Sequence, residues 1–230
     1  MAGDRLLPVL PALESLLPGG GLRRGSVVTV GGSSVTGSTS LALSLLAAVS
    51  AQGSWCAAVG LPALGLAAAA EMGVVLERFP VVASVGRGSG PGGWAWVVAA
   101  LIDAVDVVLA GPPSGPGGGV RAADARRLTA RVRERGAVLV TCGDGAWPEP
   151  AEVCLTVTSA AWEGLGRGHG HLRGRRVEVV AGGRGAAARE RRAQLWLPHP
   201  DGGVRQVEDE EAGKEVTSGE RRPHARRVVS

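Results

Sequence analysis

Residues 26–52 read SVVTVGGSSVTGSTSLALSLLAAVSAQ, and this stretch decides the fold. A β-branched run, Val27–Val30, leads into a glycine- and serine-rich loop, which opens into an apolar segment of helical character. A strand, a glycine loop and a helix in this order form the context that a phosphate-binding loop requires. The spacing agrees with G-x-x-x-x-G-K-S/T, and it predicts a phosphate loop with the residues Gly32, Gly37, Ser38 and Thr39.

The predicted phosphate loop lacks its lysine. Ser38 carries no charge at the position whose lysine reaches the β- and γ-phosphates, and the single lysine of the chain, Lys214, lies far away in a polar tail. Backbone N–H groups and a helix N-terminus attract an anion only weakly by comparison. We therefore expect a loop kept for its shape, with no catalytic residue, no cofactor and at most weak ATP binding.

Length and charge restrict the remaining choices. A chain of 230 residues is long enough for one α/β domain with a sizeable core. The formal net charge is only +4, but residues 167–192 contain eight arginines against two glutamates. Such a segment is either a solvated basic face or a surface for the phosphate backbone of DNA or RNA. The candidate nucleic-acid contacts are Arg167, Arg173, Arg175, Arg176 and Arg184.

The cysteines and histidines indicate no metal site. Cys56, Cys142 and Cys154 form no C-x-x-C pair and lie in apolar surroundings typical of buried thiols in a reducing compartment. His169 and His171 have no nearby cysteine or acid to complete a set of three or four ligands. The sequence also shows neither a signal peptide nor an unbroken apolar run of membrane-spanning length. We expect a cytoplasmic protein with no membrane partner, and association with the nucleoid is left open.

Strand and helix patterns alternate through the first 150 residues. Expected strands are 26–30, 55–60, 79–84, 106–110 and 137–142, and expected helices are 39–52, 64–72, 94–105 and 125–135. This alternation predicts an α/β fold with a mainly parallel sheet flanked by helices on both faces. From Ala151 onward, strand patterns at 153–158, 176–180 and 193–197 without intervening helices predict an antiparallel C-terminal extension. The predicted organisation is an N-terminal lead (1–25), a core (26–200) and a disordered charged tail (201–230).

The order and spacing of these segments resemble the RecA-type ATPase core over residues 16–197. Residues 16–25 (LLPGGGLRRG) resemble the lead into the first core strand of that family, and residues 31–40 (GGSSVTGSTS) lie at its phosphate loop. Residues 104–110 (AVDVVLA) resemble the Walker B strand, and 137–143 (AVLVTCG) the strand that leads to a DNA-contacting loop. Residues 55–60 (WCAAVG) and 175–185 (RRVEVVAGGRG) resemble the second and the last core strands. The resemblance implies a RecA-like P-loop fold with degenerate Walker motifs.

The positions that carry the chemistry of that family are altered in this chain. The Walker B aspartate falls on Gly111, and the glutamate that activates water falls within Gly60–Ala63, which contains no acid. The polar switch residue falls near Gly143. Because phosphoryl transfer depends on placed positive charge, a metal ion and an oriented water, we expect that the chain is not an ATPase.

Among RecA-like proteins, residues 162–180 (WEGLGRGHGHLRGRRVEVV) and the missing lysine resemble the actinobacterial ImuA-type proteins, which are related to SulA. This resemblance implies a non-catalytic accessory of an error-prone translesion complex in the SOS response to DNA damage. Its partners would be an ImuB-like Y-family polymerase homologue and an error-prone replicative-type polymerase. The arginine-rich segment, and not the resemblance, is what suggests DNA as a further partner. Two alternatives are a DNA-binding recombination or repair protein that acts through the arginine-rich segment, and a SulA-type inhibitor of cell division.

Overall fold

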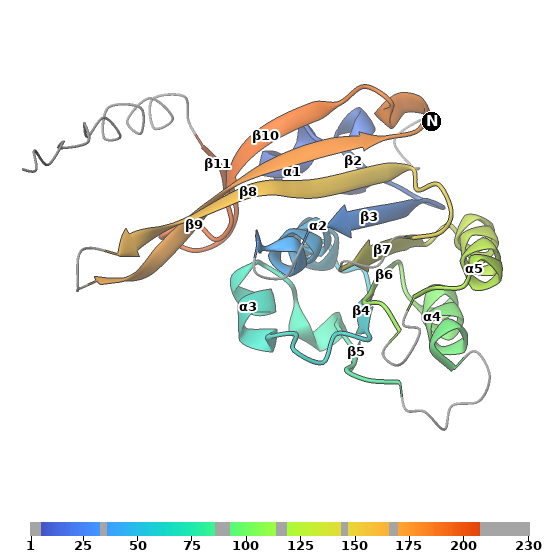
Figure 1. The fold of residues 1–230 in the computed structure, drawn as a ribbon. Helices are drawn as coiled ribbons and strands as arrows, with labels where there is room; N and C mark the ends of the chain where they lie inside the picture. The colour runs from blue at the N-terminus through green and yellow to red at the C-terminus, as the bar shows by residue number, and fades with distance from the viewer. Residues whose placement is uncertain are drawn as a thin grey trace, which may run out of the picture.

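A computed structural model shows an α/β architecture built on a large mixed sheet (Figure 1). It describes residues 6–32, 36–85, 93–113, 119–143, 147–165 and 170–207. The strand order across this part of the chain is β11-β10-β9-β8-β3-β7-β6-β4-β5. The strands are β3 (Val27–Gly31), β4 (Cys56–Val59), β5 (Val81–Val82), β6 (Val107–Ala110), β7 (Val138–Cys142), β8 (Val153–Leu165), β9 (Gly170–Gly183), β10 (Arg191–Trp196) and β11 (Arg205–Gln206).

The first half of the sheet confirms the predicted parallel arrangement. Strands β3, β7, β6, β4 and β5 are paired in parallel. Strands β4 and β6 are buried along their whole length, so a near-continuous apolar run replaces the alternating pattern of a half-exposed strand. The helices that follow these strands are α2 (Ser38–Ala51), α3 (Leu66–Glu71), α4 (Gly93–Ala104) and α5 (Ala122–Arg135), with a short 3-10 turn η4 (Leu76–Arg78).

Helices cover both faces of the sheet and create two apolar clusters. The larger cluster includes Leu41, Leu45 and Leu46 of α2, none of which is exposed to solvent. The smaller cluster joins α4 and α5 to the opposite face, through residues such as Ile102 and Leu128. The sheet is therefore enclosed between α2 and the α4–α5 pair, as Figure 1 shows.

The predicted antiparallel extension is present, but it begins one strand later than expected. Strand β8 lies parallel to β3, and the antiparallel pairing starts between β8 and β9 and continues through β10 and β11. Both β8 and β9 are also much longer than the sequence pattern predicted, and their hairpin extends beyond the body of the molecule (Figure 1). Two register shifts interrupt their pairing, and these shifts obscure the alternation that reveals a strand in sequence.

The residues that flank the predicted core on both sides are ordered where the structure describes them. The lead folds as β1 (Leu6–Pro8), α1 (Pro11–Glu14), a 3-10 turn η2 (Pro18–Gly20) and β2 (Gly21–Arg23), and it buries Leu13, Leu16 and Leu22 in the larger cluster. At the other end, β11 pairs with β10 and Val207 is buried, so residues 201–207 are ordered parts of the core. Contacts with elements that are distant in sequence order both segments. The rest of the predicted tail, 208–230, lies outside the described residues.

The structure also bears on the expected lack of a membrane-spanning segment and on the expected burial of the three cysteines. No helix in the described ranges combines the length and apolar character that crossing a bilayer requires. Cys56 and Cys142 are buried as predicted, whereas Cys154 is exposed, which corrects the prediction for that thiol. Cys154 alternates with the buried Val153 and Leu155 on β8, so its side chain projects from the other face of the strand.

Candidate functional site

The predicted phosphate loop joins β3 to α2, at the carboxyl end of a parallel strand near the centre of the sheet. Gly32 and Gly37 both have a positive φ, of 102° and 103°, a conformation that glycine adopts without strain. Ser38 starts the helix and is only 1% exposed, and its hydroxyl has no hydrogen-bond partner among the described residues. Thr39 follows, with its hydroxyl 4.0 Å from the Cys142 thiol. Residues 33–35 lie outside the described residues, so the site consists of the two ends of the loop.

Arg175 of β9 reaches this loop from the antiparallel extension. Its Nη2 donates to the Ser40 hydroxyl at 3.1 Å, and its Nε donates to the Leu197 carbonyl at 2.9 Å. A Cβ at position 37 would lie 2.6 Å from the guanidinium carbon, so the guanidinium packs directly on the backbone of Gly37. The Trp162 ring covers the guanidinium, 4.9 Å from its centroid. The loop therefore has a fixed cation beside it, although its own sequence supplies none.

The surroundings of Arg175 are unusual for a charged group. The side chain belongs to a residue that is 5% exposed, and burial lowers the pKa of its guanidinium below the ordinary value. It also lies beside the first turn of α2, where the helix dipole disfavours a cation. Hydrogen bonds to an oxygen on either side and an aromatic face compensate for these costs. The arrangement holds the positive charge in one position and shields it from water.

The position expected for a Walker B acid has no room for a side chain. A Cβ at Gly111 would lie 2.7 Å from the Leu61 Cδ2 and 2.9 Å from the carbonyl carbon of Gly60. The Trp94 indole also donates to the Gly111 carbonyl at 3.0 Å. Close packing of the ends of β4 and β6 thus excludes a carboxylate at this point, and no cluster of three or more histidine, cysteine or acidic residues occurs in the described ranges.

The candidate nucleic-acid contacts do not form one surface. Arg173 is exposed on β9, but Arg175 is buried against the predicted phosphate loop, which corrects its assignment as a nucleic-acid contact. Arg176 bonds to the Glu163 carboxylate at 2.7 Å and stacks on the Trp196 ring at 4.7 Å. Arg184 lies at the opposite end of β9, next to the start of β8, and Arg167 lies outside the described residues.

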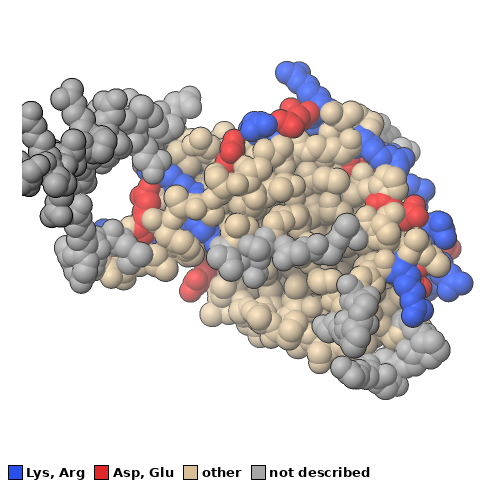
Figure 2. All heavy atoms as spheres, viewed as in Figure 1, with Lys and Arg blue, Asp and Glu red and all other residues tan. Residues whose placement is uncertain are grey.

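Alternation along the strand explains this separation. Successive side chains of β9 project to opposite faces, so Arg175 and Arg176 cannot share a contact surface. Figure 2 shows charged side chains gathered along the rim beside α5 and near the hairpin, with a largely uncharged face between them. The arginines of residues 167–192 are therefore divided between separate surfaces of the protein.

Sequence reasoning missed the contact of Arg175 with the loop. Arg175 and Ser40 are 135 residues apart, and no motif links them. The arginine doublet at 175–176 was the only local signal, and it indicated a surface instead. Pairing of β9 with β8, and of β8 with β3, brings the arginine to the loop.

Two comparisons with known proteins bear on this site. Residues 15–149 match the family described as the MT3502 N-terminal domain. This range of the chain contains the predicted phosphate loop, α4 and α5. An uncharacterized protein of Mycobacterium tuberculosis, Rv3395c, is 34% identical over 186 residues, which cover 75% of this chain and 87% of that protein. The match to the family ends before β8 and β9, so the strand that carries Arg175 lies beyond it.

Proposed function

The chain belongs to the MT3502 family, and we propose that it is a non-catalytic accessory of an error-prone translesion DNA synthesis complex, built on a RecA-like core. The proposed partners are an ImuB-like Y-family polymerase homologue and an error-prone replicative-type polymerase. The proposed compartment is the cytoplasm. The resemblance of residues 16–197 to the RecA-type core, and of residues 162–180 to ImuA-type proteins, supports this assignment.

The packing of Arg175 on the predicted phosphate loop is the observation that carries the non-catalytic part of the proposal. A bound nucleotide needs close contact between its phosphates and the loop backbone. At Gly37 a guanidinium already makes that contact, and bonds to Leu197 and Ser40 hold it there. The Arg175 guanidinium thus occupies the space next to the Gly37 backbone that a phosphate would need.

Gly111, which directly follows β6, supports the same conclusion. Mg²⁺ at a phosphate site is usually held by a carboxylate at the end of this strand together with the loop hydroxyl. Because Gly60 and Leu61 occupy the space that a side chain at 111 would need, the backbone itself is arranged without that carboxylate. We infer that both the packing of the site and its residue types prevent ATP turnover.

Two measurements test the two parts of the proposal separately. Calorimetry with millimolar Mg-ATP should give no binding heat, and purified protein should release no phosphate from ATP. Affinity purification of the tagged chain from its own host after DNA damage should recover a Y-family polymerase homologue. The Thr39→Ala variant is the matched control, because it removes the hydroxyl that a nucleotide site would use for Mg²⁺.

The outcomes distinguish an accessory from an enzyme. Equal recovery of the polymerase homologue with wild type and Thr39→Ala supports the proposal. ATP hydrolysis that disappears in Thr39→Ala would refute its non-catalytic part. Recovery of division proteins in place of polymerases would refute the translesion assignment and favour a SulA-type role.

A further inference from the structure

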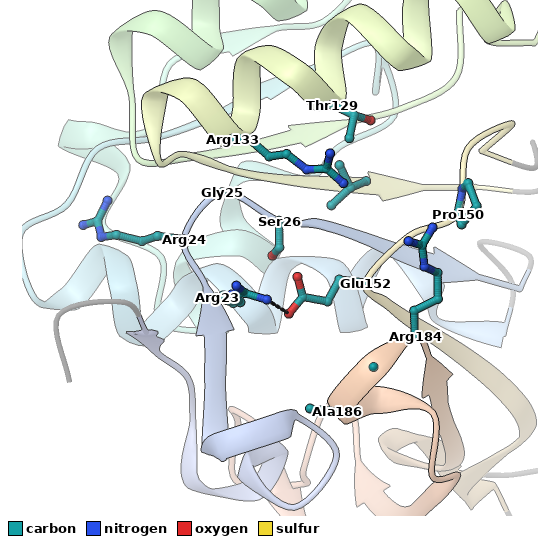
Figure 3. A pocket seen from close by; sticks show the side chains of 12 residues that line it. Arg23, Arg24, Gly25, Ser26, Thr129, Arg133, Pro150, Glu152, Arg184 and Ala186 are labelled. Carbon is teal, nitrogen blue, oxygen red and sulfur yellow. Dashed lines mark hydrogen bonds and ion pairs between the residues drawn. The ribbon is translucent and has the colours of Figure 1, made fainter. Parts of the chain in front are cut away.

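A cavity of about 540 Å³ opens at the amino ends of the central strands (Figure 3). The predicted phosphate loop lies at the other, carboxyl end of β3. Four arginines from separate segments line it: Arg23 and Arg24 before β3, Arg133 on α5, and Arg184 after β9. Glu152, just before β8, is the single acidic residue among the described residues of the lining. The concentration of guanidinium groups is therefore far higher here than the modest net charge of the chain suggests.

The fold holds these segments close together through the backbone. Gly25 has a φ of 79°, and a Cβ there would lie 3.4 Å from the Cα of Arg133, so the turn before β3 packs tightly on α5. The Gly25 N–H donates to the Ala137 carbonyl at 2.8 Å. On the other wall, the Arg184 N–H donates to the Glu152 carbonyl at 3.1 Å. The cavity is thus framed by core hydrogen bonds and has fixed walls.

The charges of the cavity are only partly compensated. Arg23 is 3.4 Å from the Glu152 carboxylate, and Arg24 turns away to bond the Asp106 carboxylate at 2.9 Å (Figure 3). Within the part of the chain that the structure describes, the guanidinium groups of Arg133 and Arg184 have neither an ion pair nor a hydrogen bond. Figure 3 shows both side chains directed toward the space between α5 and the start of β8. An excess of positive charge without a protein partner remains in the cavity.

A buried hydroxyl provides an independent indication of a ligand. The Thr129 Oγ1, one turn before Arg133 on α5, is buried in the cavity lining and has no hydrogen-bond partner among the described residues. An unpartnered buried hydroxyl costs free energy unless a ligand or water satisfies it. Guanidinium forks and a hydroxyl are the groups that bind a tetrahedral oxyanion. Among the residues that the structure describes, no aromatic side chain lines the cavity, so they offer a nucleobase no stacking surface.

We propose that this cavity binds a phosphoryl group of the monoester class, either as a free phosphate or as the phosphorylated end of a DNA strand. A monoester carries between about −1.5 and −2 charges at neutral pH, which matches two unpaired guanidinium groups better than a diester does. Walls from three segments enclose the cavity, and they suit the terminal phosphate of a strand better than a phosphodiester in the middle of a continuous strand. This site does not depend on the proposed accessory role, because it lies away from the predicted phosphate loop.

The test measures binding of two probes to the full chain. Calorimetry measures affinity for inorganic phosphate, and fluorescence anisotropy measures affinity for a 3′-labelled single-stranded DNA with a 5′-phosphate or a 5′-hydroxyl. The double variant R133Q/R184Q should weaken phosphate binding about a hundredfold, since each charged hydrogen-bonding group contributes roughly tenfold. The double variant R126Q/R127Q is the control, because it removes the same charge from exposed positions of α5 outside the cavity.

A second variant separates ligand binding from folding. Thr129→Val keeps the shape of the side chain and should weaken phosphate binding several-fold while leaving the unfolding temperature equal or higher, because it removes an unsatisfied hydroxyl.

A preference for the 5′-phosphate over the 5′-hydroxyl that R133Q/R184Q abolishes would identify the DNA end as the source. Binding of free phosphate alone, abolished by the same variant, would support the site with a free ligand. Equal affinity in R133Q/R184Q and R126Q/R127Q would overturn the proposal.

Discussion

Replacement of Arg175 by methionine should destabilise the protein by about 3 kcal/mol. The change keeps the length of the side chain but removes the donors to the Leu197 carbonyl and the Ser40 hydroxyl, together with the stack on Trp162. Hydrogen bonds from a charged group contribute about 1.5–3 kcal/mol each, and a stacked cation about 0.5–2 kcal/mol. Removal of the charge also has two stabilising effects, because the charge is buried and because it lies at the start of α2, where the helix dipole disfavours a cation. The dipole effect offsets about 0.3–1 kcal/mol of the loss.

Urea unfolding followed by far-ultraviolet circular dichroism measures this difference without depending on the fluorescence of Trp162. In a thermal scan the same loss corresponds to a fall in Tm of roughly 6–12 °C for a domain of this size. Arg173→Met is the matched control, because Arg173 is exposed on the same strand and should change stability by less than about 0.5 kcal/mol. A loss below about 0.5 kcal/mol for Arg175→Met, or an equal loss for both variants, would refute the structural role of Arg175 at the loop.

Three further outcomes follow from the packing and the charges. Gly111→Asp should fail to restore Mg-ATP binding and should lower the free energy of unfolding by about 3 kcal/mol, because its Cβ overlaps Leu61. Arg131, with a smaller effect of the neighbouring Arg135, lowers the pKa of Asp103 to about 2, so this carboxylate stabilises the fold fully above about pH 4 and loses its effect as the pH falls through about 2. The urea midpoints of wild type and Asp103→Asn should therefore differ at neutral pH and converge near pH 2. A thiol reagent at pH 8 should modify Cys154 only, because Cys56 and Cys142 are buried and burial raises the pKa of the Cys56 thiol to about 12.

Each of these outcomes has its own control. Gly119→Asp should leave stability unchanged, since a Cβ at that position meets no atom within 4 Å. A pH-independent gap between wild type and Asp103→Asn would contradict the assigned ion pairs with α5. Modification of a Cys154→Ser variant under native conditions would show that a buried thiol is accessible, against the burial described for β4 and β7.

Much of the parallel half of the fold could be predicted because its signals are local. Strand β3, the glycine loop and α2 are adjacent in sequence, and their apolar periods and glycines reveal them directly. The antiparallel half was predicted less accurately. Register shifts hide the length of β8 and β9, and β11 is a strand of two residues that forms only against β10. Pattern reasoning cannot detect a strand whose stability comes from its neighbour.

The sequence by itself determined the α/β class, the positions of the loop glycines, the lack of a lysine in the loop and the lack of an acid at position 111, since each depends on residue type and spacing along the chain. Only the tertiary structure decided where the arginines act. Arg175 lies at the loop, Arg176 pairs with Glu163, and Arg184 joins Arg133 and Arg23 in a cavity at the other end of the sheet. Strand pairing separates neighbours in sequence and joins distant residues, so the surface on which a charge acts is a property of register and topology.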